Sequence, residues 1–319
     1  MPVSDSFELL AVTTRSDQLE SYHFGALVAL DASGEIELAL GDPELAVYGR
    51  SSNKPMQAVA MLRAGLDLAP ELLALTCASH SGTPAHLALA LQILAAVELD
   101  EHALANTAGY PLDNDSMRAI VRAGGDKTPL QMNCSGKHAS MVNTCVCNHW
   151  SFEDGAYLDV DHPLQRRITE TIAELAVREV SHVGVDGCGA PAHVLPLVGV
   201  AQAFRNIAIG PEPSDEHRVY EAMTRFPFNV GGPGRDVTTF MQTIPGLMAK
   251  DGAEGVFVAA MPDGRAVALK IADGSDRARP VVMAAALAAI GVDVSEAQAA
   301  WRVPIFGHGR PVGEVTATF

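Results

Sequence analysis

The chain has 319 residues, of which 48% are hydrophobic and only 19% are charged, and its formal net charge at pH 7 is −16. A polypeptide of this size can bury a substantial core, as one large domain or two small ones. The strong negative charge disfavours nucleic acid and anionic membrane surfaces as partners. A zwitterionic or anionic small molecule would therefore need a locally cationic pocket.

The first residues carry no basic start followed by an apolar run, so no signal peptide is visible. The longest apolar stretch, residues 281–292, is too short to span a bilayer. On this basis we expect a cytoplasmic protein. Its five cysteines are odd in number and widely spread, which in that compartment favours buried thiols or metal ligands over disulfides.

Strand-like runs lie near both ends of the chain. Residues 22–30 and 35–41 flank a turn-forming Asp-Ala-Ser-Gly segment, which predicts a hairpin. Residues 255–261 and 265–271 flank Pro-Asp-Gly and predict a second hairpin, and residues 313–319 form a strand-like tail. The chain therefore supplies strands for a sheet from both of its ends.

The segment between the two hairpins is rich in Ala and Leu and predicts a series of helices. They follow Ser51, then cover about 84–97, 115–123, 137–147, 163–178 and 215–226, with a late helix at 275–291. This order predicts an α/β protein of the α+β type, with an antiparallel sheet and an inserted helical lobe. We expect a single catalytic domain over residues 1–319, with the sheet from about 7–45 and 245–319 and the helical lobe at about 50–243.

An early Ser-x-x-Lys element suggests a reaction. If a helix starts at Ser51, Lys54 lies about one turn on and its amine can reach the Ser51 hydroxyl. Serine needs an adjacent base to attack an amide, and lysine is a base only when neutral. Lowering a lysine pKa from about 10.4 to about 7 costs roughly 4 to 5 kcal/mol. The element therefore predicts a buried, locally positive pocket, although the same spacing also marks ordinary helix starts.

Two loops add further candidates. The stretch 77–82, Cys-Ala-Ser-His-Ser-Gly, offers His80 as a general base, or Ser81 or Thr83 as the N-cap of the next helix. The glycine-rich segments 187–191 and 230–235 match no nucleotide-binding fingerprint, so we interpret them as loops that line a site.

A second group has the composition of a metal site. Cys134 and Cys188 lie in separate loops, and Lys137 and His138 follow the first of them. Two thiols with a nitrogen ligand are typical of a tetrahedral zinc site with one open position, and chemistry alone favours His138 as the third ligand. The alternative is that both cysteines pack as small hydrophobic residues.

Three short elements occur in an informative order. Ser51-x-x-Lys54, Ser79-His80-Ser81 and Lys250-Asp251-Gly252 follow the order Ser-x-x-Lys, Ser-x-Ser, Lys-x-Gly of penicillin-recognising serine enzymes. Taken alone, Lys250 would be interpreted as a solubilising charge at a sheet edge.

With these elements the chain resembles the asparaginase II family, the rhizobial-type or class 3 L-asparaginases, whose fold is similar to serine β-lactamases and glutaminases. The resemblance covers most of the length. It rests on Arg50-Ser51-x-x-Lys54-Pro55 and on the blocks at 77–81, 133–138 (Asn-Cys-Ser-Gly-Lys-His), 161–165 (Asp-His-Pro-Leu-Gln) and 186–188 (Asp-Gly-Cys).

The resemblance implies two Ser–Lys tandems, Ser51 with Lys54 and Ser79 with Lys250. It also implies a zinc ion held by Cys134, Lys137 and Cys188, which replaces the chemical preference for His138 and leaves that imidazole free to contact the substrate. A homodimer is implied as well.

The resulting hypothesis is an L-asparaginase. Neutral Lys54 takes the proton of Ser51 as Ser51 attacks the side-chain amide of L-asparagine, ammonia leaves, and water hydrolyses the aspartyl ester. Ser79 and Lys250 would relay protons and keep Lys54 neutral by like-charge proximity.

Two further side chains are candidates for binding the amino acid itself. Arg50 could clamp the α-carboxylate and Asp186 the α-ammonium group. Four alternatives remain open at this point: a zinc amidohydrolase that uses metal-bound water, a glutaminase, a β-lactamase or peptidase, and a non-catalytic amino-acid-binding protein.

Overall fold

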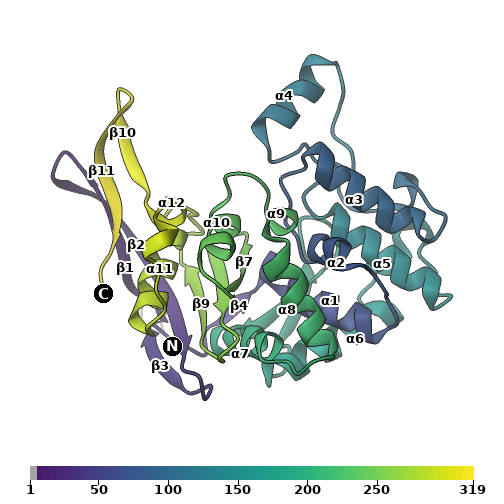
Figure 1. Cartoon of the computed structure of the whole chain (residues 1–319), viewed down its shortest axis with the longest axis horizontal. Helices are drawn as coiled ribbons and strands as arrows, with labels where there is room; N and C mark the ends of the chain where they lie inside the picture. The colour runs from purple at the N-terminus through teal and green to yellow at the C-terminus, as the bar shows by residue number, and fades with distance from the viewer. Residues whose placement is uncertain (1–5) are drawn as a thin grey trace.

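The computed structural model describes residues 6–319, and its centre is an eight-stranded sheet in which every pairing is antiparallel (Figure 1). The strand order is β10-β11-β1-β2-β9-β8-β7, and β3 pairs with β2. The strands are β1 Glu8–Arg15, β2 Gln18–Leu30, β3 Ile36–Leu40, β7 Met248–Gly252, β8 Val256–Ala260, β9 Ala266–Ile271, β10 Pro304–Gly307 and β11 Arg310–Ala317. The signal-peptide prediction concerns mainly residues 1–5, which lie outside the described residues.

Both predicted hairpins are present. In β2–β3 Leu30 pairs with Ile36, and in β8–β9 Ala260 pairs with Ala266. The two hairpins meet where β2 pairs with β9, so strands from the two ends of the chain lie side by side at the middle of the sheet. The predicted antiparallel sheet with an inserted helical lobe is therefore confirmed.

The helical lobe lies between β3 and β7 in the chain. Its helices are α1 Lys54–Arg63, α2 Pro70–Thr76, α3 Pro84–Ala95, α4 Asn114–Arg122, α5 Ser135–Cys147, α6 Pro163–Ala176, α7 Leu197–Ala208, α8 Asp215–Arg225, α9 Pro227–Val230 and α10 Asp236–Thr243. Two helices follow the sheet hairpin, α11 Arg279–Ala289 and α12 Gln298–Trp301. The lobe also contains a small three-stranded sheet that the sequence did not predict, formed by β4 Ala46–Tyr48, β6 Pro191–Pro196 and β5 His182–Val185 in that order.

The core places the start of α1 at the junction between sheet and lobe. Every residue of α1 from Lys54 to Leu62 is buried, and the 3₁₀ turn at Arg50–Asn53 packs against β7. Helices α7 and α11 both pack against β8 and β9, and every residue of β8 is buried, so both faces of the sheet are covered. The Ser51 and Lys54 region is thus fixed by a rigid core on two sides.

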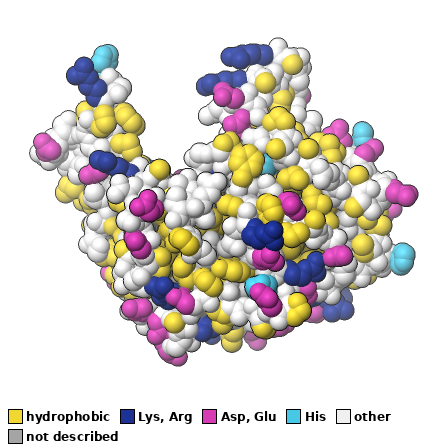
Figure 2. Space-filling view, in the orientation of Figure 1, with side chains coloured by type: hydrophobic (Ala, Val, Ile, Leu, Met, Phe, Trp, Pro, Cys, Tyr) yellow, Lys and Arg dark blue, Asp and Glu magenta, His cyan; other side chains and the backbone are white. Residues whose placement is uncertain are grey.

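Two parts of the molecule project from this body. The β10–β11 and β1–β2 hairpins form an arm at the left of Figure 1, α4 projects at the upper right, and the surface between them is hollowed (Figure 2). The arm exposes apolar side chains at Leu19, Tyr22 and Phe306. Within residues 6–319, no helix combines the length and apolarity needed to cross a membrane.

Candidate active site

Lys54 is the centre of the candidate site. Its side chain is 1% exposed, and Nζ donates to the backbone oxygen of Ala78 at 2.5 Å, to Ser79 Oγ at 3.0 Å and to Cys134 Sγ at 3.2 Å. These partners come from the loop after α2 and from the residue before α5. The buried amine therefore joins one serine of the predicted set to one thiol of the predicted metal group.

Ser51 lies in the 3₁₀ turn and is half-buried. The sequence predicts a hydrogen bond between Ser51 and Lys54, but within residues 6–319 the hydrogen bonds of the Lys54 amine go to Ala78, Ser79 and Cys134. The three-residue spacing predicts that the two side chains start on one side of a helix. The Lys54 side chain then extends away from Ser51 into the protein, where backbone and side-chain acceptors from other segments accept its hydrogen bonds.

Lys250, predicted as the partner of Ser79, bonds to the residue next to it. It lies on the edge strand β7 but is fully buried, which excludes the role of a solubilising surface charge. Its Nζ donates to the backbone oxygen and to Oδ1 of Asp251, both at 2.6 Å. Burial lowers the pKa of Lys250 from 10.5 to about 8; Asp251 opposes this shift and the charge of Lys54 adds to it.

Asp251 holds a cluster of cations that sequence reasoning missed. Its Oδ2 accepts a short charge-assisted bond from Arg235 and lies 3.8 Å from Arg279. Burial alone would raise the pKa of Asp251, but Lys250, Arg235 and Arg279 outweigh burial and hold that pKa well below its usual range. The signals available in the sequence were the glycine-rich loop before Arg235 and the adjacency of Asp251 to Lys250.

A cavity of about 290 Å³ contains both predicted serines. Its lining residues are Ser51, Ser79, Leu112, Asn133, Arg235, Asp251, Gly252, Ala253, Asp276 and Arg279. Its small volume and charged walls suit a small polar metabolite.

The predicted metal ligands also lie together. Lys137 Nζ donates to Cys188 Sγ at 3.2 Å, and a hydrogen bond from Cys134 lowers the pKa of the Cys188 thiol, although burial opposes it. Burial also acts to lower the pKa of Lys137, but the neighbouring thiols raise it above its ordinary value. Cys134, Cys188 and Lys137 are all buried, as are Cys77 and Cys145 elsewhere in the lobe.

This group fits a zinc ion in its donor chemistry, because thiolate sulfur and nitrogen are the ligands that zinc prefers. In the described part of the chain no group of three or more His, Cys, Asp or Glu side chains is arranged to hold a metal, so a zinc site here would need Lys137 as a ligand. A nearby polar atom also supports a bound ligand here: Nε2 of His138 is buried and has no hydrogen-bond partner among the described residues.

His138 is held in place by the block at 161–165. Its Nδ1 bonds to Tyr157 Oη at 2.9 Å, and the backbone oxygen of Tyr157 accepts from Gln165 Nε2 at 2.8 Å. His162 caps α6 by accepting from the backbone N–H of Leu164 at 3.2 Å. This block therefore contributes indirectly, by positioning the ring that faces the thiols.

Arg50 and Asp186, the predicted substrate clamps, are paired with each other. Arg50 Nε donates to Asp186 Oδ1 at 2.9 Å, and Nη2 lies 2.8 Å from the same oxygen. The backbone of Arg50 has φ of +51°, a left-handed conformation that non-glycine residues adopt rarely. The ion pair therefore links the turn before α1 to the Asp186 loop, and the left-handed backbone of Arg50 is part of that turn.

His80 serves a structural role. The backbone N–H of Gly82 donates to its Nδ1 at 3.1 Å, so the ring proton is on Nε2, which bonds to Ser135 Oγ at 2.9 Å. Complete burial lowers the pKa of His80 well below 6.5, with His86 and Lys54 adding to the shift. The N-cap of α3 is Thr83, whose hydroxyl and backbone N–H both bond to His86 Nδ1. The capping alternative from the sequence is therefore the one the structure contains.

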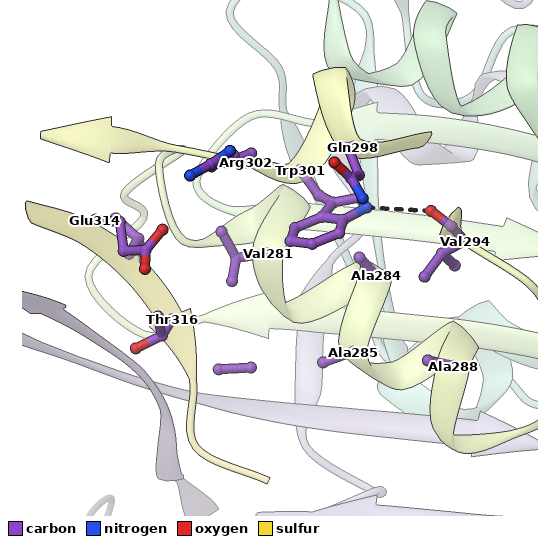
Figure 3. A pocket seen from close by; sticks show the side chains of 12 residues that line it. Val281, Ala284, Ala285, Ala288, Val294, Gln298, Trp301, Arg302, Glu314 and Thr316 are labelled. Carbon is purple, nitrogen blue, oxygen red and sulfur yellow. Dashed lines mark hydrogen bonds between the residues drawn. The ribbon is translucent and has the colours of Figure 1, made fainter. Parts of the chain in front are cut away.

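A cavity of about 550 Å³ lies away from these residues, between α11, α12 and β11 (Figure 3). Trp301 covers it and donates from Nε1 to the backbone oxygen of Val294 at 3.3 Å. Its lining, all within the described residues, is mostly Ala and Val and contains no Ser, Cys, His or Lys. It therefore contains none of the serine and lysine residues predicted for catalysis.

The family model for L-asparaginase II matches residues 11–317. The chain therefore belongs to the L-asparaginase II family. No curated protein matches the chain.

Solved structures give distant similarities. Mglu in its native form aligns with a TM-score of 0.44 and 14% identity, over 82% of this chain and 62% of Mglu, so the chain spans less than two thirds of that protein. EstCE1, a hydrolase with promiscuous acyltransferase activity, aligns with a TM-score of 0.43 and 13% identity, over 83% of this chain and 93% of EstCE1. A mutant of simvastatin synthase (LovD) from Aspergillus terreus aligns with a TM-score of 0.35 and 11% identity, over 77% of this chain and 86% of LovD.

Proposed function

We propose that this protein hydrolyses L-asparagine to L-aspartate and ammonia through a serine activated by Lys54. The observation that carries the proposal is the 3.0 Å contact between Lys54 Nζ and Ser79 Oγ, in which a buried amine meets a hydroxyl that lines a small polar cavity. A nucleophile within hydrogen-bond reach of its base is the arrangement that serine hydrolysis needs. This contact favours Ser79 as the nucleophile over Ser51, which lines the same cavity.

In the proposed reaction Lys54 acts as the base in its neutral form. A neutral amine has two N–H donors and one lone pair, and Lys54 has three partners. The two donors can serve the Ala78 carbonyl and Cys134 Sγ, while the lone pair accepts the Ser79 proton. As Ser79 Oγ bonds to the amide carbon, its proton moves to Lys54 and is then delivered to the departing ammonia; water next hydrolyses the aspartyl ester.

Lys250 supports this state electrostatically. Its ammonium group is paired with the carboxylate of Asp251, and it lies close enough to Lys54 for the two ammonium groups to repel each other. Burial and the repulsion from Lys54 together lower the pKa of Lys250. In our proposal Lys250 is the neighbouring cation that helps Lys54 to act as a base.

Zinc, if bound, would be held by Cys134, Lys137 and Cys188. It would neutralise the thiolates and fix the loop that ends at Cys134 against the Asp186–Cys188 loop. Because Cys134 also contacts Lys54, the same loop sets the position of the proposed base. His138 and Asp186 are kept as candidates for substrate contact, the latter for the α-ammonium group.

The proposal is tested by ammonia release from L-asparagine. The wild type should release ammonia, and Ser79→Ala and Lys54→Met should each lower kcat by about 10³-fold or more. Ser140→Ala, which removes another buried hydrogen-bonded hydroxyl, and the surface substitution Lys127→Met are matched controls and should retain activity. Activity that survives Ser79→Ala but is lost in Ser51→Ala would transfer the nucleophile role to Ser51.

The alternatives give different results in the same assay. A glutaminase would prefer L-glutamine, and an enzyme that uses metal-bound water would survive both serine substitutions yet stop on chelation. A penicillin-recognising enzyme would acquire the mass of penicillin on a serine. A binding protein would bind L-asparagine without releasing ammonia. We also propose a homodimer in the cytoplasm, and light scattering of the purified protein tests the dimer.

A further inference from the structure

We propose that Arg235 is the specificity-determining residue that binds the α-carboxylate of the substrate. The inference rests on the proposed function and extends it, since it assigns a ligand to one end of the amino acid. Arg235 lines the cavity that contains Ser51 and Ser79, and its side chain is 23% exposed. Its Nη1 lies 3.4 Å from the backbone oxygen of Ser79, so the guanidinium is next to the proposed nucleophile.

The glycine-rich loop before Arg235 determines where the guanidinium lies. Gly232 has φ of +113°, and a Cβ there would come within 2.6 Å of Ser81 Cβ, so the loop packs on the Ser79–Ser81 segment only because this residue is glycine. Arg235 then precedes α10, and its Nη2 is fixed on Asp251 Oδ2. The Ser79 carbonyl and Asp251 occupy only part of a guanidinium that has five N–H donors, and the others remain for a ligand in the cavity.

The charges around the cavity leave room for one more anion. Arg279 is paired with the largely buried Asp236 at 3.1 Å; its other partner, Asp276 at 2.9 Å, is 69% exposed, so water screens that third carboxylate. Asp251 then remains as a single carboxylate against two cations, Lys250 and Arg235. An incoming α-carboxylate supplies the missing negative charge, and a planar guanidinium suits it because it can donate two parallel bonds.

The other arginines near the site are less suited to this role. Arg279 is only 8% exposed, and its Nη atoms are taken by Asp236, Asp276 and the Gly252 carbonyl. Arg50 is bound to Asp186, and it lines a different cavity, together with Tyr48 and Lys270. Arg235 is the arginine that combines a free edge with a place beside both serines.

The test compares two substrates that differ only in the carboxylate. L-Asparagine and 3-aminopropanamide share the amide and the ammonium group, and the second lacks the α-carboxylate. In Arg235→Gln we expect kcat/KM for L-asparagine to fall about 100-fold, mainly through KM, and kcat/KM for 3-aminopropanamide to stay within about threefold of the wild type. Arg235→Lys keeps a positive charge beside Asp251, so its kcat/KM for L-asparagine should lie between those of the wild type and Arg235→Gln. Arg63→Gln removes a similarly exposed arginine with two acidic partners and should leave kcat/KM unchanged for both substrates.

Several outcomes overturn the proposal. An equal loss on both substrates shows that Arg235 only ties the α10 loop to β7, and an unchanged KM for L-asparagine shows that it does not bind the carboxylate. If Arg235→Gln fails to fold, Arg235→Lys decides by the same comparison.

A failure of the proposed function is distinguished by binding. If the wild type releases ammonia from neither substrate, the asparaginase proposal fails, and calorimetry with L-aspartate and with 3-aminopropanoate then tests Arg235 by itself. Binding of L-aspartate that is lost in Arg235→Gln, with 3-aminopropanoate bound equally weakly by both proteins, supports the assignment. L-Aspartate binding that is absent from the wild type, or equal in wild type and variant, overturns it.

Discussion

Substitution of Lys250 by Met should stabilise the protein at neutral pH and remove one component of its pH dependence. Lys250 is fully buried, and burial lowers its pKa from 10.5 to about 8. At about 1.4 kcal/mol per pKa unit, folding with a protonated Lys250 carries a penalty of roughly 3 kcal/mol. That penalty is complete below pH 8, where folded and unfolded states are both protonated, and it disappears above about pH 10.5, where both are neutral.

The sign follows from the proton count. Between about pH 8 and 10.5 the unfolded state binds more protons than the folded state, so the free energy of unfolding of the wild type rises with pH in this window. Methionine has no proton to lose. The difference in unfolding free energy, wild type minus Lys250→Met, should therefore increase by roughly 3 kcal/mol from pH 7 to pH 10.5.

Urea unfolding at a series of pH values and constant ionic strength measures this difference. Lys127→Met replaces an exposed lysine and is the matched control, for which the difference should not change with pH. A flat or falling difference curve for Lys250→Met would refute the reasoning, because it would show that the buried amine is not forced toward its neutral form.

Three further predictions concern the surroundings of the site. His80→Asn should cost about 1 to 3 kcal/mol of stability through the lost bond to Ser135 but change kcat only a few-fold; a folded variant without activity would restore His80 as a base. Gly136→Ala should lower the thermal midpoint at a cost of about 1 to 3 kcal/mol, because its Cβ would lie 2.6 Å from the backbone oxygen of Leu75; an unchanged midpoint would contradict this packing. Added zinc should raise the midpoint of the chelator-treated wild type but not of Cys134→Ser, and equal zinc content in both proteins would remove Cys134 from the ligand set.

The sheet was predictable because its signals are local. Turn residues between β-rich runs identified the β2–β3 and β8–β9 hairpins, and their positions near the two ends of the chain implied a sheet with an inserted lobe. Helix α7 was not predicted: it directly follows the strand β6, and the valines near its start are equally typical of a strand. Strands β4 and β5 have only three and four residues, and β6 begins and ends at a proline, which disfavours a strand prediction.

The site was only partly predictable because its contacts are tertiary. The Ser-x-x-Lys spacing predicted Lys54 as a base, which stays a prediction, and the partner of its amine depends on how the loop after α2 lies against α1. In the same way, Arg235 and Arg279 meet Asp251 only once α10, α11 and β7 have packed together. An isolated arginine in the sequence gives no local signal that predicts such a tertiary contact.

The central claim, that Ser79 activated by Lys54 carries the acyl group, is tested most directly by locating the covalent intermediate. The protein is mixed with L-asparagine, quenched in acid within the first turnover, digested and analysed by mass spectrometry. The account predicts an aspartyl group on the peptide that contains Ser79, and no such adduct in Lys54→Met. An aspartyl group on the peptide that contains Ser51, or ammonia release without any adduct, would contradict it.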